Sequence, residues 1–404
     1  MQWDQILATR SQRMKASEIR ELLKLLDQPD IISFAGGIPD PALFPTDAFS
    51  QAMTDAMGAD AATGALQYSV SEGYLPLREW IAADMQRLGV PCDADNILIT
   101  SGSQQALDYL GKLMISPQDT VLCGWPTYLG ALSAFNAYEP HFEQVSPHGN
   151  VGAAEYRARA KAAGGRAKFA YLSVDFANPT GETLDLRARE NLLDLAADMD
   201  LAIVEDAAYQ ALRYEGDPIP PILALDIARC GNIDAARTIY CGSFSKTLAP
   251  GLRVGWVCAA KPVIGRLVLM KQASDLHSAS LNQMVVAQVA KTILKDHITV
   301  LRESYKARRD CMLTALQRET PEGVQWTQPK GGMFIWMTLP DGIDGATLLA
   351  SSLENERVAF VPGRAFFADG SGGNTLRLSY SCATPDQIDE GIARLGKLLR
   401  RVVG

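Results

Sequence analysis

The stretch TIYCGSFSKTLAPGLRVGW, residues 238–256, combines a β-branched strand, a turn with serine and glycine, one lysine, one arginine and a second apolar run. The hydroxyls of Ser243 and Ser245 precede Lys246, and Arg253 follows it by seven positions. Such a turn can hold a phosphate with hydroxyls and a guanidinium while it offers an amine to a carbonyl group. A solvated lysine in a strand–helix loop shows the same local pattern, so this stretch alone leaves both interpretations open.

The composition is that of an ordinary globular protein. The chain has 404 residues, of which 47% are hydrophobic and 21% are charged, enough for two domains or for one large α/β domain with a smaller companion. The net charge of −8 argues against a nucleic-acid surface, which needs a basic stripe. No apolar run approaches the roughly 20 residues that span a bilayer. We therefore expect neither a nucleic acid nor a membrane as a partner.

Targeting and metal-binding signals are also missing from the sequence. The N-terminus MQWDQILATRSQRMK has no apolar signal-peptide segment, so we expect a cytoplasmic protein. Seven scattered cysteines without a CxxC pair indicate reduced thiols, and four histidines without an HExxH pattern argue against a metal enzyme. The phosphate-loop patterns GxxxxGK[ST] and strand-linked GxGxxG do not occur.

The first third of the chain contains helical segments and one glycine-rich turn. KASEIRELLKLLD, residues 15–27, has apolar residues at helical spacing and predicts an amphipathic helix that ends at Pro29. ISFAGGIPDPALFP, residues 32–45, starts like a strand, and its Gly36–Gly37 pair either permits close approach to a ligand or forms a tight turn. Helical patterns return at 47–57 and 75–88, with Tyr68 in the loop between them.

From Asn96 onward, strands and helices alternate as in a parallel sheet with helical crossovers. The predicted strands are NILIT (96–100), TVLCG (120–124), FAYLSV (169–174), LAIVED (201–206) and TIYC (238–241). Polar residues follow their carboxyl ends, where open α/β sheets bind ligands. They are Ser103 and Gln104 at a helix start that suits a phosphate, Tyr128, Asn178, Asp206 with Tyr209, and the group around Lys246. Asp206 needs a partner for its carboxylate, unless it caps the next helix.

After about residue 260 the alternation ends. A helical region at about 283–318 precedes three separate strand segments, GGMFIWMTL (331–339), VAFVPG (358–363) and TLRLSY (375–380). This pattern of one helical region followed by separate strand segments predicts a second, partly antiparallel α+β domain. The last helix starts with a capping box in which Thr384 is the N-cap and Gln387 the third helical residue.

Together, these polar residues supply the parts that bind one cofactor, pyridoxal 5′-phosphate. The cofactor needs a lysine amine for its aldehyde, a carboxylate that keeps its pyridine nitrogen protonated, donors for its O3′ oxygen, a stacking aromatic and a phosphate cup. The chain resembles the fold-type I pyridoxal-phosphate enzymes, aminotransferase classes I and II. The resemblance covers nearly the whole chain, through SFAGGIPDPALFP, LQYSVSEGYLPLREW, ITSGSQQALD, NPTG, EDAAY, SFSKTLAPGLRVGW and LRLSY.

The resemblance implies an α/β fold with a large, mainly parallel sheet between helices and a smaller α+β domain. We expect an N-terminal helix and arm at 1–45 that joins the small domain, a large cofactor-binding domain at 46–285 and a small C-terminal domain at 286–404. It also implies a homodimer with shared active sites, because Tyr68 matches a tyrosine that reaches the phosphate of the partner subunit.

The same resemblance assigns roles to the site residues. Lys246 matches the lysine that binds the cofactor aldehyde, Asp206 matches the partner of the pyridine nitrogen, and both are catalytic together with Tyr209. The remaining cofactor contacts are Tyr209 and Asn178 on O3′, Tyr128 stacked on the ring, and Ser103, Gln104, Ser243, Ser245 and Arg253 around the phosphate. The family often has a cis peptide bond before the proline of the NPTG motif, here Pro179.

The substrate-binding residues follow from the resemblance as well. Arg377 matches the arginine whose planar donors bind the substrate α-carboxylate, and Asn178 and Gly37 lie in matching segments. The relatives with this kind of N-terminus include 2-aminoadipate, kynurenine, aromatic and branched-chain aminotransferases, in which the N-terminal helix lines the substrate pocket. Ser17 and Arg20 are therefore candidates, with Arg20 either pairing with a distal carboxylate or lying solvated near Glu21 and Lys24.

The expected reaction moves an amino group from an amino acid to a 2-oxo acid, with 2-oxoglutarate as the expected acceptor. One alternative is a lyase or decarboxylase on the same scaffold, because fold does not determine reaction. The other is a regulatory domain that binds pyridoxal phosphate. Such regulators carry a basic winged-helix region before the aminotransferase-like part, and here the pattern starts by residue 15, which disfavours that interpretation.

Overall fold

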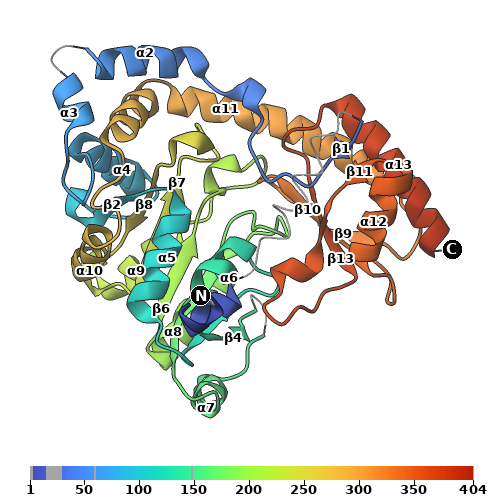
Figure 1. Cartoon of the computed structure of the whole chain (residues 1–404), viewed down its shortest axis with the longest axis horizontal. Coiled ribbons are helices and arrows are strands. Elements are labelled where there is room, and N and C mark those ends of the chain that lie inside the picture. Colours follow the sequence, from blue (N-terminus) through green and yellow to red (C-terminus); the bar gives the residue numbers. More distant parts are fainter. Residues whose placement is uncertain (1–2, 15–29, 59–60, 147–148, 404) are drawn as a thin grey trace.

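The computed structural model describes residues 3–14, 30–58, 61–146 and 149–403 (Figure 1). Its helices are α2 (Thr46–Ala56), α3 (Ala62–Leu66), α4 (Leu75–Arg87), α5 (Ser103–Met114), α6 (Leu129–Asn136), α7 (Ala153–Ala162), α8 (Leu186–Met199), α9 (Ile222–Cys230), α10 (Lys261–Gln272), α11 (Ser280–Glu319), α12 (Gly345–Asn355) and α13 (Pro385–Val403). Its strands are β1 (Ile32–Ser33), β2 (Ile97–Thr100), β3 (Thr120–Cys123), β4 (His141–Gln144), β5 (Ala167–Ser173), β6 (Ala202–Asp206), β7 (Thr238–Ser243), β8 (Gly255–Cys258), β9 (Gln325–Trp326), β10 (Phe334–Thr338), β11 (Val358–Ala359), β12 (Val361–Pro362) and β13 (Thr375–Ser379).

Among the described residues, seven strands form the larger sheet in the order β2-β8-β7-β6-β5-β3-β4. Neighbours from β7 to β4 are parallel, whereas β8 runs antiparallel to both β7 and β2. All five strands predicted between residues 96 and 241 lie in this sheet, so the α/β prediction is confirmed. The structure adds β8, formed by the apolar run after Arg253, and the edge strand β4.

The strands of this sheet are apolar on both faces because helices cover both faces. Leu98 of β2 and Ile239 of β7 pack with α5, α6 and α10 on one face. Ile97, Ile99 and Tyr240, the adjacent strand positions, pack with α4, α9 and α11 on the other face. The alternation of side chains along each strand thus divides one continuous apolar sequence between two cores.

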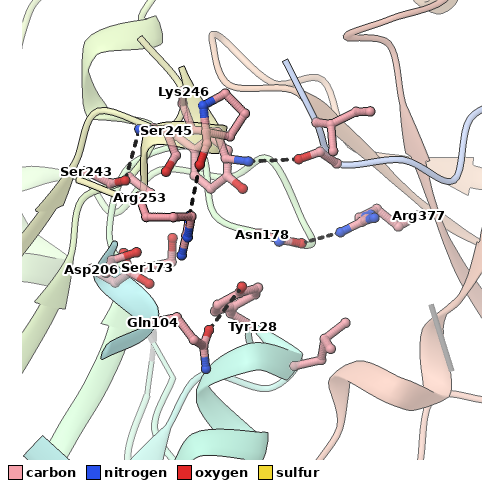
Figure 2. Close-up of a pocket in the computed structure, with 17 residues that line it drawn as sticks. Gln104, Tyr128, Ser173, Asn178, Asp206, Ser243, Ser245, Lys246, Arg253 and Arg377 are labelled. Atoms are coloured by element: carbon pink, nitrogen blue, oxygen red, sulfur yellow. Dashed lines mark hydrogen bonds between the residues drawn. The ribbon is translucent and has the colours of Figure 1, made fainter. Parts of the chain in front are cut away.

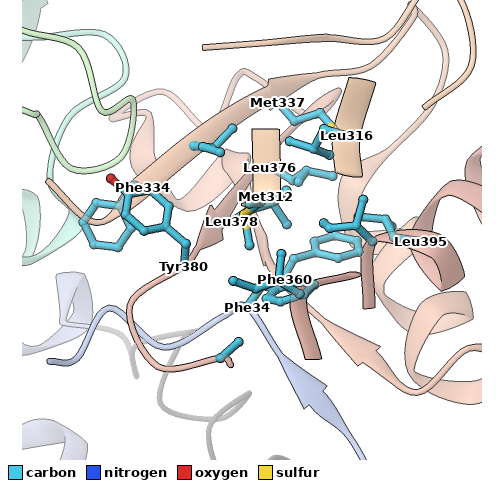
Figure 3. Packing of buried hydrophobic residues seen from close by; sticks show 14 of the residues in the cluster. Phe34, Met312, Leu316, Phe334, Met337, Phe360, Leu376, Leu378, Tyr380 and Leu395 are labelled. Atoms are coloured by element: carbon cyan, nitrogen blue, oxygen red, sulfur yellow. The ribbon is translucent and has the colours of Figure 1, made fainter. Parts of the chain in front are cut away.

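A second sheet has the order β12-β13-β10-β9, and its paired strands are antiparallel. Its core contains Phe334 and Leu378 from the strands, Met312 from α11, Leu395 from α13, and Phe34 from the segment after β1 (Figure 3). In Figure 1, α11 runs from the helices of the large sheet to the small sheet. The predicted antiparallel α+β part is therefore confirmed.

The structure bears on one predicted helix start and on one predicted domain boundary. Thr384 and Gln387 form the expected reciprocal capping box, with hydrogen bonds of 3.0 and 3.3 Å. The expected boundary between 285 and 286 falls inside the 40-residue helix α11, and the three-part division stays a prediction. The helix predicted for residues 15–27, with Ser17 and Arg20, lies outside the described residues. None of the described helices is both long and apolar enough to cross a membrane.

Candidate active site

A cavity of about 310 Å³ lies at the carboxyl ends of β5, β6 and β7 and extends to the small sheet (Figure 2). Twelve of the predicted site residues line it, namely Gly37, Ser103, Gln104, Tyr128, Asn178, Asp206, Tyr209, Ser243, Ser245, Lys246, Arg253 and Arg377. Sequence reasoning missed five further lining residues, Ile38, Leu129, Ser173, Ala208 and Pro250. Ser173 is the last residue of β5, so its strand-end position was an available signal.

Lys246 lies three residues beyond the end of β7, in the turn that the sequence analysis singled out. Its Nζ donates a hydrogen bond to the carbonyl oxygen of Gly37 at 2.9 Å and lies 5.7 Å from the centre of the Tyr209 ring. Burial, and then the nearby cations of Arg377 and Arg253, lower the pKa of Lys246 to about 8. An amine with this pKa is partly neutral near pH 7, as a nucleophile or a general base requires.

Asp206 ends β6 and is buried beneath the cavity. The Tyr171 hydroxyl donates to its Oδ2 at 2.7 Å, whereas Oδ1 has no hydrogen-bond partner among the described residues. Burial raises the pKa of Asp206, and the hydrogen bond from Tyr171 opposes that rise. A buried carboxylate oxygen without a donor is costly, so this wall of the cavity fits a ligand that presents a protonated ring nitrogen.

A second part of the cavity wall has the features of an anion site. Ser103 begins α5 directly after Gly102, whose backbone is left-handed with a φ of 76°. A Cβ at Gly102 would lie 2.4 Å from Nη2 of Arg253, so only glycine lets the guanidinium pack against this turn. A helix N-terminus, a guanidinium and the hydroxyls of Ser243 and Ser245 together suit a phosphate group.

Arg377 reaches the same cavity from β13 of the small sheet. Its Nη1 donates to Asn178 Oδ1 and its Nη2 to the carbonyl oxygen of Ala35, both at 2.8 Å, and its guanidinium lies 4.3 Å from the centre of the Phe334 ring. Burial lowers the pKa of Arg377 to about 10. No described carboxylate pairs with this buried cation, and Nε has no partner, so the position suits an anionic substrate group.

Gly37 lies between the Lys246 and Arg377 groups. Its carbonyl accepts the Lys246 hydrogen bond, and a Cβ on it would lie 3.0 Å from Phe334 and 3.5 Å from Nη2 of Arg377. Of the Gly36–Gly37 pair, Gly37 therefore permits the close approach of the backbone to the site, whereas a Cβ at Gly36 would meet only Ile38 at 3.7 Å. The Asn178–Pro179 peptide bond, next to the Arg377 contact, is cis as expected.

Comparison of the sequence with protein-family models identifies a family that fits this site. The family model described as aminotransferase class I and II matches residues 29–395. The chain belongs to this family. It is therefore a pyridoxal-phosphate-dependent aminotransferase of fold type I, and the donor set described above fits that cofactor.

Two curated relatives and one solved structure show how similar this aminotransferase is to other members. A 2-aminoadipate transaminase from Thermus thermophilus is 42% identical over 99% of this chain and 98% of its own length. Aromatic-amino-acid aminotransferase 1 from Thermococcus litoralis is 41% identical over 99% of this chain and 95% of its own length. LysN, an alpha-aminoadipate aminotransferase from Thermus thermophilus complexed with N-(5′-phosphopyridoxyl)-L-leucine, superimposes with a TM-score of 0.88, 40% identity and 100% and 99% coverage.

Among the described residues, one predicted site residue of this aminotransferase, Tyr68, does not line the cavity. Tyr68 is 79% exposed, and its ring lies edge-on to His277 at 6.0 Å. Ser17 and Arg20 lie outside the described residues. Within the cavity, the Tyr128 hydroxyl donates to Gln104 Oε1 at 3.4 Å, so Gln104 and Tyr128 lie side by side at the starts of α5 and α6 (Figure 2).

Proposed function

We propose that this aminotransferase takes the amino group of an L-amino acid of the 2-aminoadipate, aromatic or branched-chain type and transfers it to 2-oxoglutarate. The substrate classes are those suggested by the family resemblance and by the names of the similar proteins, which include an aromatic and a 2-aminoadipate enzyme. The observation that carries the proposal is that Lys246 and Arg377, from different sheets, face one cavity. An amine and a carboxylate-binding group in the same cavity suit an α-amino acid.

The cofactor, when bound, supplies an aldehyde for the amino group and a ring that takes up the electrons released at the substrate Cα. We assign Oδ1 of Asp206 to the protonated ring nitrogen, because this buried oxygen has no other partner among the described residues. Tyr209 and Asn178 are assigned as donors to the ring oxygen and Tyr128 as the stacking ring. The phosphate contacts are assigned to Ser103, Gln104, Ser243, Ser245 and Arg253.

The chain's own residues then bind and orient the amino acid. Nε or a displaced nitrogen of Arg377, together with Asn178, binds the α-carboxylate, and the Phe334 ring holds the guanidinium plane in position. When it is not attached to the cofactor, Lys246 Nζ would take the proton from the substrate Cα. Its lowered pKa makes the neutral, proton-accepting form available near pH 7.

A homodimer with shared active sites is part of the proposal. Tyr68 is exposed on the single chain, and exposed Leu66 and Val70 surround it in the sequence, as expected for a segment that a second copy covers. We propose that Tyr68 reaches the phosphate of the partner subunit and that the enzyme acts in the cytoplasm. Sedimentation of the purified enzyme tests the dimer, and a monomer with full activity contradicts it.

We propose that Arg20 binds the distal carboxylate of a substrate with an acidic side chain. The Arg20→Ala variant should lose activity toward 2-aminoadipate more than toward leucine or phenylalanine, because only the first substrate has a distal carboxylate. Equal losses for all three substrates would remove Arg20 from the specificity role.

A substrate panel tests the whole proposal. The purified enzyme is mixed with 2-oxoglutarate and each of 2-aminoadipate, kynurenine, phenylalanine and leucine, and glutamate, ammonia and carbon dioxide are measured. Glutamate formation with one or more of these donors supports the proposal. Ammonia or carbon dioxide without glutamate would instead indicate a lyase or decarboxylase. The Lys246→Ala variant is the negative control and should form no glutamate above background.

A further inference from the structure

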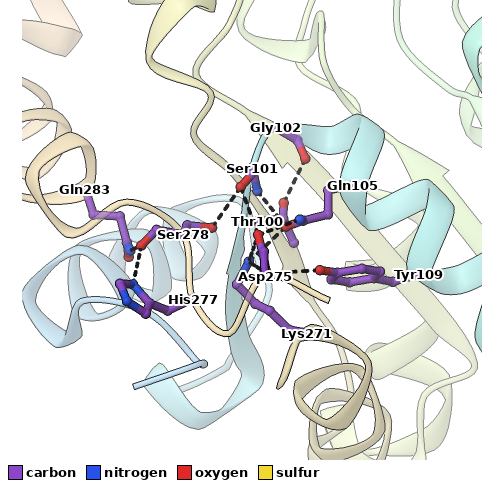
Figure 4. Close-up of polar contacts among 10 residues, drawn as sticks. All are labelled: Thr100, Ser101, Gly102, Gln105, Tyr109, Lys271, Asp275, His277, Ser278 and Gln283. Atoms are coloured by element: carbon purple, nitrogen blue, oxygen red, sulfur yellow. Dashed lines mark hydrogen bonds and ion pairs between the residues drawn. The ribbon is translucent and has the colours of Figure 1, made fainter. Parts of the chain in front are cut away.

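An ion pair between a buried lysine and a partly exposed aspartate lies outside the cavity, between α5 and the end of α10. The side chain of Lys271 is fully buried, and its Nζ contacts Asp275 Oδ1 at 3.0 Å and Oδ2 at 3.1 Å (Figure 4). Neither residue lines the active-site cavity. A buried ammonium group is costly unless its partners are held in place, so this pair needs a reason beyond surface solvation.

Asp275 and Lys271 also form hydrogen bonds with two residues of α5, Gln105 and Tyr109. The Gln105 amide nitrogen donates to Asp275 Oδ2 at 2.7 Å, and the Tyr109 hydroxyl donates to Oδ1 at 3.2 Å. Lys271 also donates to the Gln105 amide oxygen at 2.9 Å. Gln105 is therefore held from both ends, and the rotation of its side chain is blocked.

The same Gln105 amide reaches the turn that precedes α5. Its oxygen accepts the backbone N–H of Ser101 at 2.9 Å, while the Ser101 hydroxyl lies 3.4 Å from Asp275 Oδ2. The Ser101 carbonyl in turn accepts Nη2 of Arg253 at 3.4 Å. Through Gln105 the ion pair is thus linked to the backbone of a turn whose next residues, Ser103 and Gln104, line the cavity.

We propose that the Lys271–Asp275 pair, acting through Gln105, is a positioning element for the cofactor phosphate. It holds the turn 101–104 so that the N-terminus of α5 and the Arg253 guanidinium meet the phosphate together. The inference rests on the assignment of the phosphate to this turn under the proposed function. If the pair only joined α10 to α5, its loss would destabilise the fold and would weaken the binding of pyridoxal phosphate and of pyridoxal to the same extent.

The test compares pyridoxal phosphate with pyridoxal, which has the same aldehyde and ring but no phosphate. Dissociation constants for both are measured by absorbance titration of the cofactor-free protein, for the wild type, Lys271→Met and Asp275→Asn. Both variants should raise the dissociation constant of pyridoxal phosphate about tenfold or more and change that of pyridoxal less than about twofold. The thermal midpoint of each cofactor-free protein is measured in parallel.

The two variants also separate positioning from simple charge attraction. Lys271→Met leaves an extra negative charge near the phosphate, whereas Asp275→Asn leaves an extra positive charge. Positioning predicts weaker phosphate binding for both variants. Tighter binding in Asp275→Asn, or equal losses for pyridoxal and pyridoxal phosphate in both variants, would overturn the inference.

Two more variants complete the experiment. Gln105→Ala keeps the ion pair and the contact of the Ser101 hydroxyl with Asp275, but it removes the hydrogen bond to the Ser101 backbone N–H. It should therefore weaken pyridoxal phosphate binding more than pyridoxal binding, even if the charge variants fold poorly. Unchanged binding of pyridoxal phosphate in Gln105→Ala would overturn the inference. Lys168→Met breaks the Lys168–Asp119 pair, which does not line the cavity, and should leave both constants unchanged. A wild type that binds pyridoxal as tightly as pyridoxal phosphate would overturn the phosphate assignment, and the inference with it.

Discussion

Arg377 of the small sheet donates a hydrogen bond through Nη1 to Asn178 Oδ1 of the large-sheet side at 2.8 Å, across a sequence separation of 199 residues. This contact joins the two parts of the fold at the active-site cavity. Because the guanidinium is buried and has no carboxylate partner among the described residues, it offers a substrate an unpaired positive group.

Arg377→Lys should lower kcat/KM for every amino-acid substrate by about 10- to 100-fold, because lysine cannot reproduce two parallel hydrogen bonds to a carboxylate. The loss should appear mainly in KM, with the visible absorbance of the bound cofactor unchanged. Steady-state kinetics with leucine and phenylalanine check this. Arg364→Lys, at an exposed arginine paired with Asp344, is the control and should match the wild type. Wild-type KM in Arg377→Lys would refute the carboxylate assignment.

Asp206→Asn should reduce the rate of the first half-reaction by about 100-fold or more, because an amide cannot stabilise a positive charge on the ring nitrogen. The change is nearly isosteric, and the Tyr171 hydroxyl can still donate to the side-chain oxygen. Stopped-flow absorbance with a single amino acid measures the rate. Tyr171→Phe removes one hydrogen bond to the carboxylate and should cost less than Asp206→Asn. Comparable losses in the two variants would show that Asp206 acts only through its contact with Tyr171.

The attachment of pyridoxal phosphate to the cofactor-free enzyme should accelerate as pH rises to about 8 and then level off. Burial and two arginines lower the pKa of Lys246 to about 8, so below that pH the amine is mostly protonated and cannot attack the aldehyde. Each pH unit below the midpoint should slow the reaction about tenfold. Arg377→Met, which removes the larger of the two cationic contributions, should shift the midpoint to higher pH. A rate that is constant between pH 6 and 9 would contradict the lowered pKa.

Gly102→Ala should weaken the binding of pyridoxal phosphate and destabilise the protein more than Gly216→Ala. Both glycines have a φ of 76°, a backbone conformation in which any side chain is strained by roughly 1–3 kcal/mol. Only at Gly102 does the new Cβ meet an atom, Nη2 of Arg253 at 2.4 Å, whereas nothing lies within 4 Å at Gly216. Urea unfolding and cofactor titration of the two variants measure the difference. Equal effects would mean that Arg253 moves aside without loss.

The sequence alone determined the strand–helix alternation, the class of fold and most of the cavity-lining side chains. This was possible because each of those residues belongs to a local signal: a strand end before Asp206, the NPTG turn at Asn178, and the serine-rich turn before Lys246. Local chemistry is visible in local sequence. The antiparallel place of β8 between β2 and β7 was not visible, because pairing partners distant in sequence leave no local signal.

Only the tertiary structure decided which polar groups are partnered. The sequence indicates that Asp206 needs a partner, but only the packed protein shows Tyr171 on Oδ2 and, among the described residues, nothing on Oδ1. Likewise, the lowered pKa of Lys246 comes from burial and from Arg377, which lies 131 positions away in the chain. Desolvation and contacts between distant residues depend on the folded arrangement, and for this reason the electrostatics of the site followed from the structure whereas its residue types followed from the sequence.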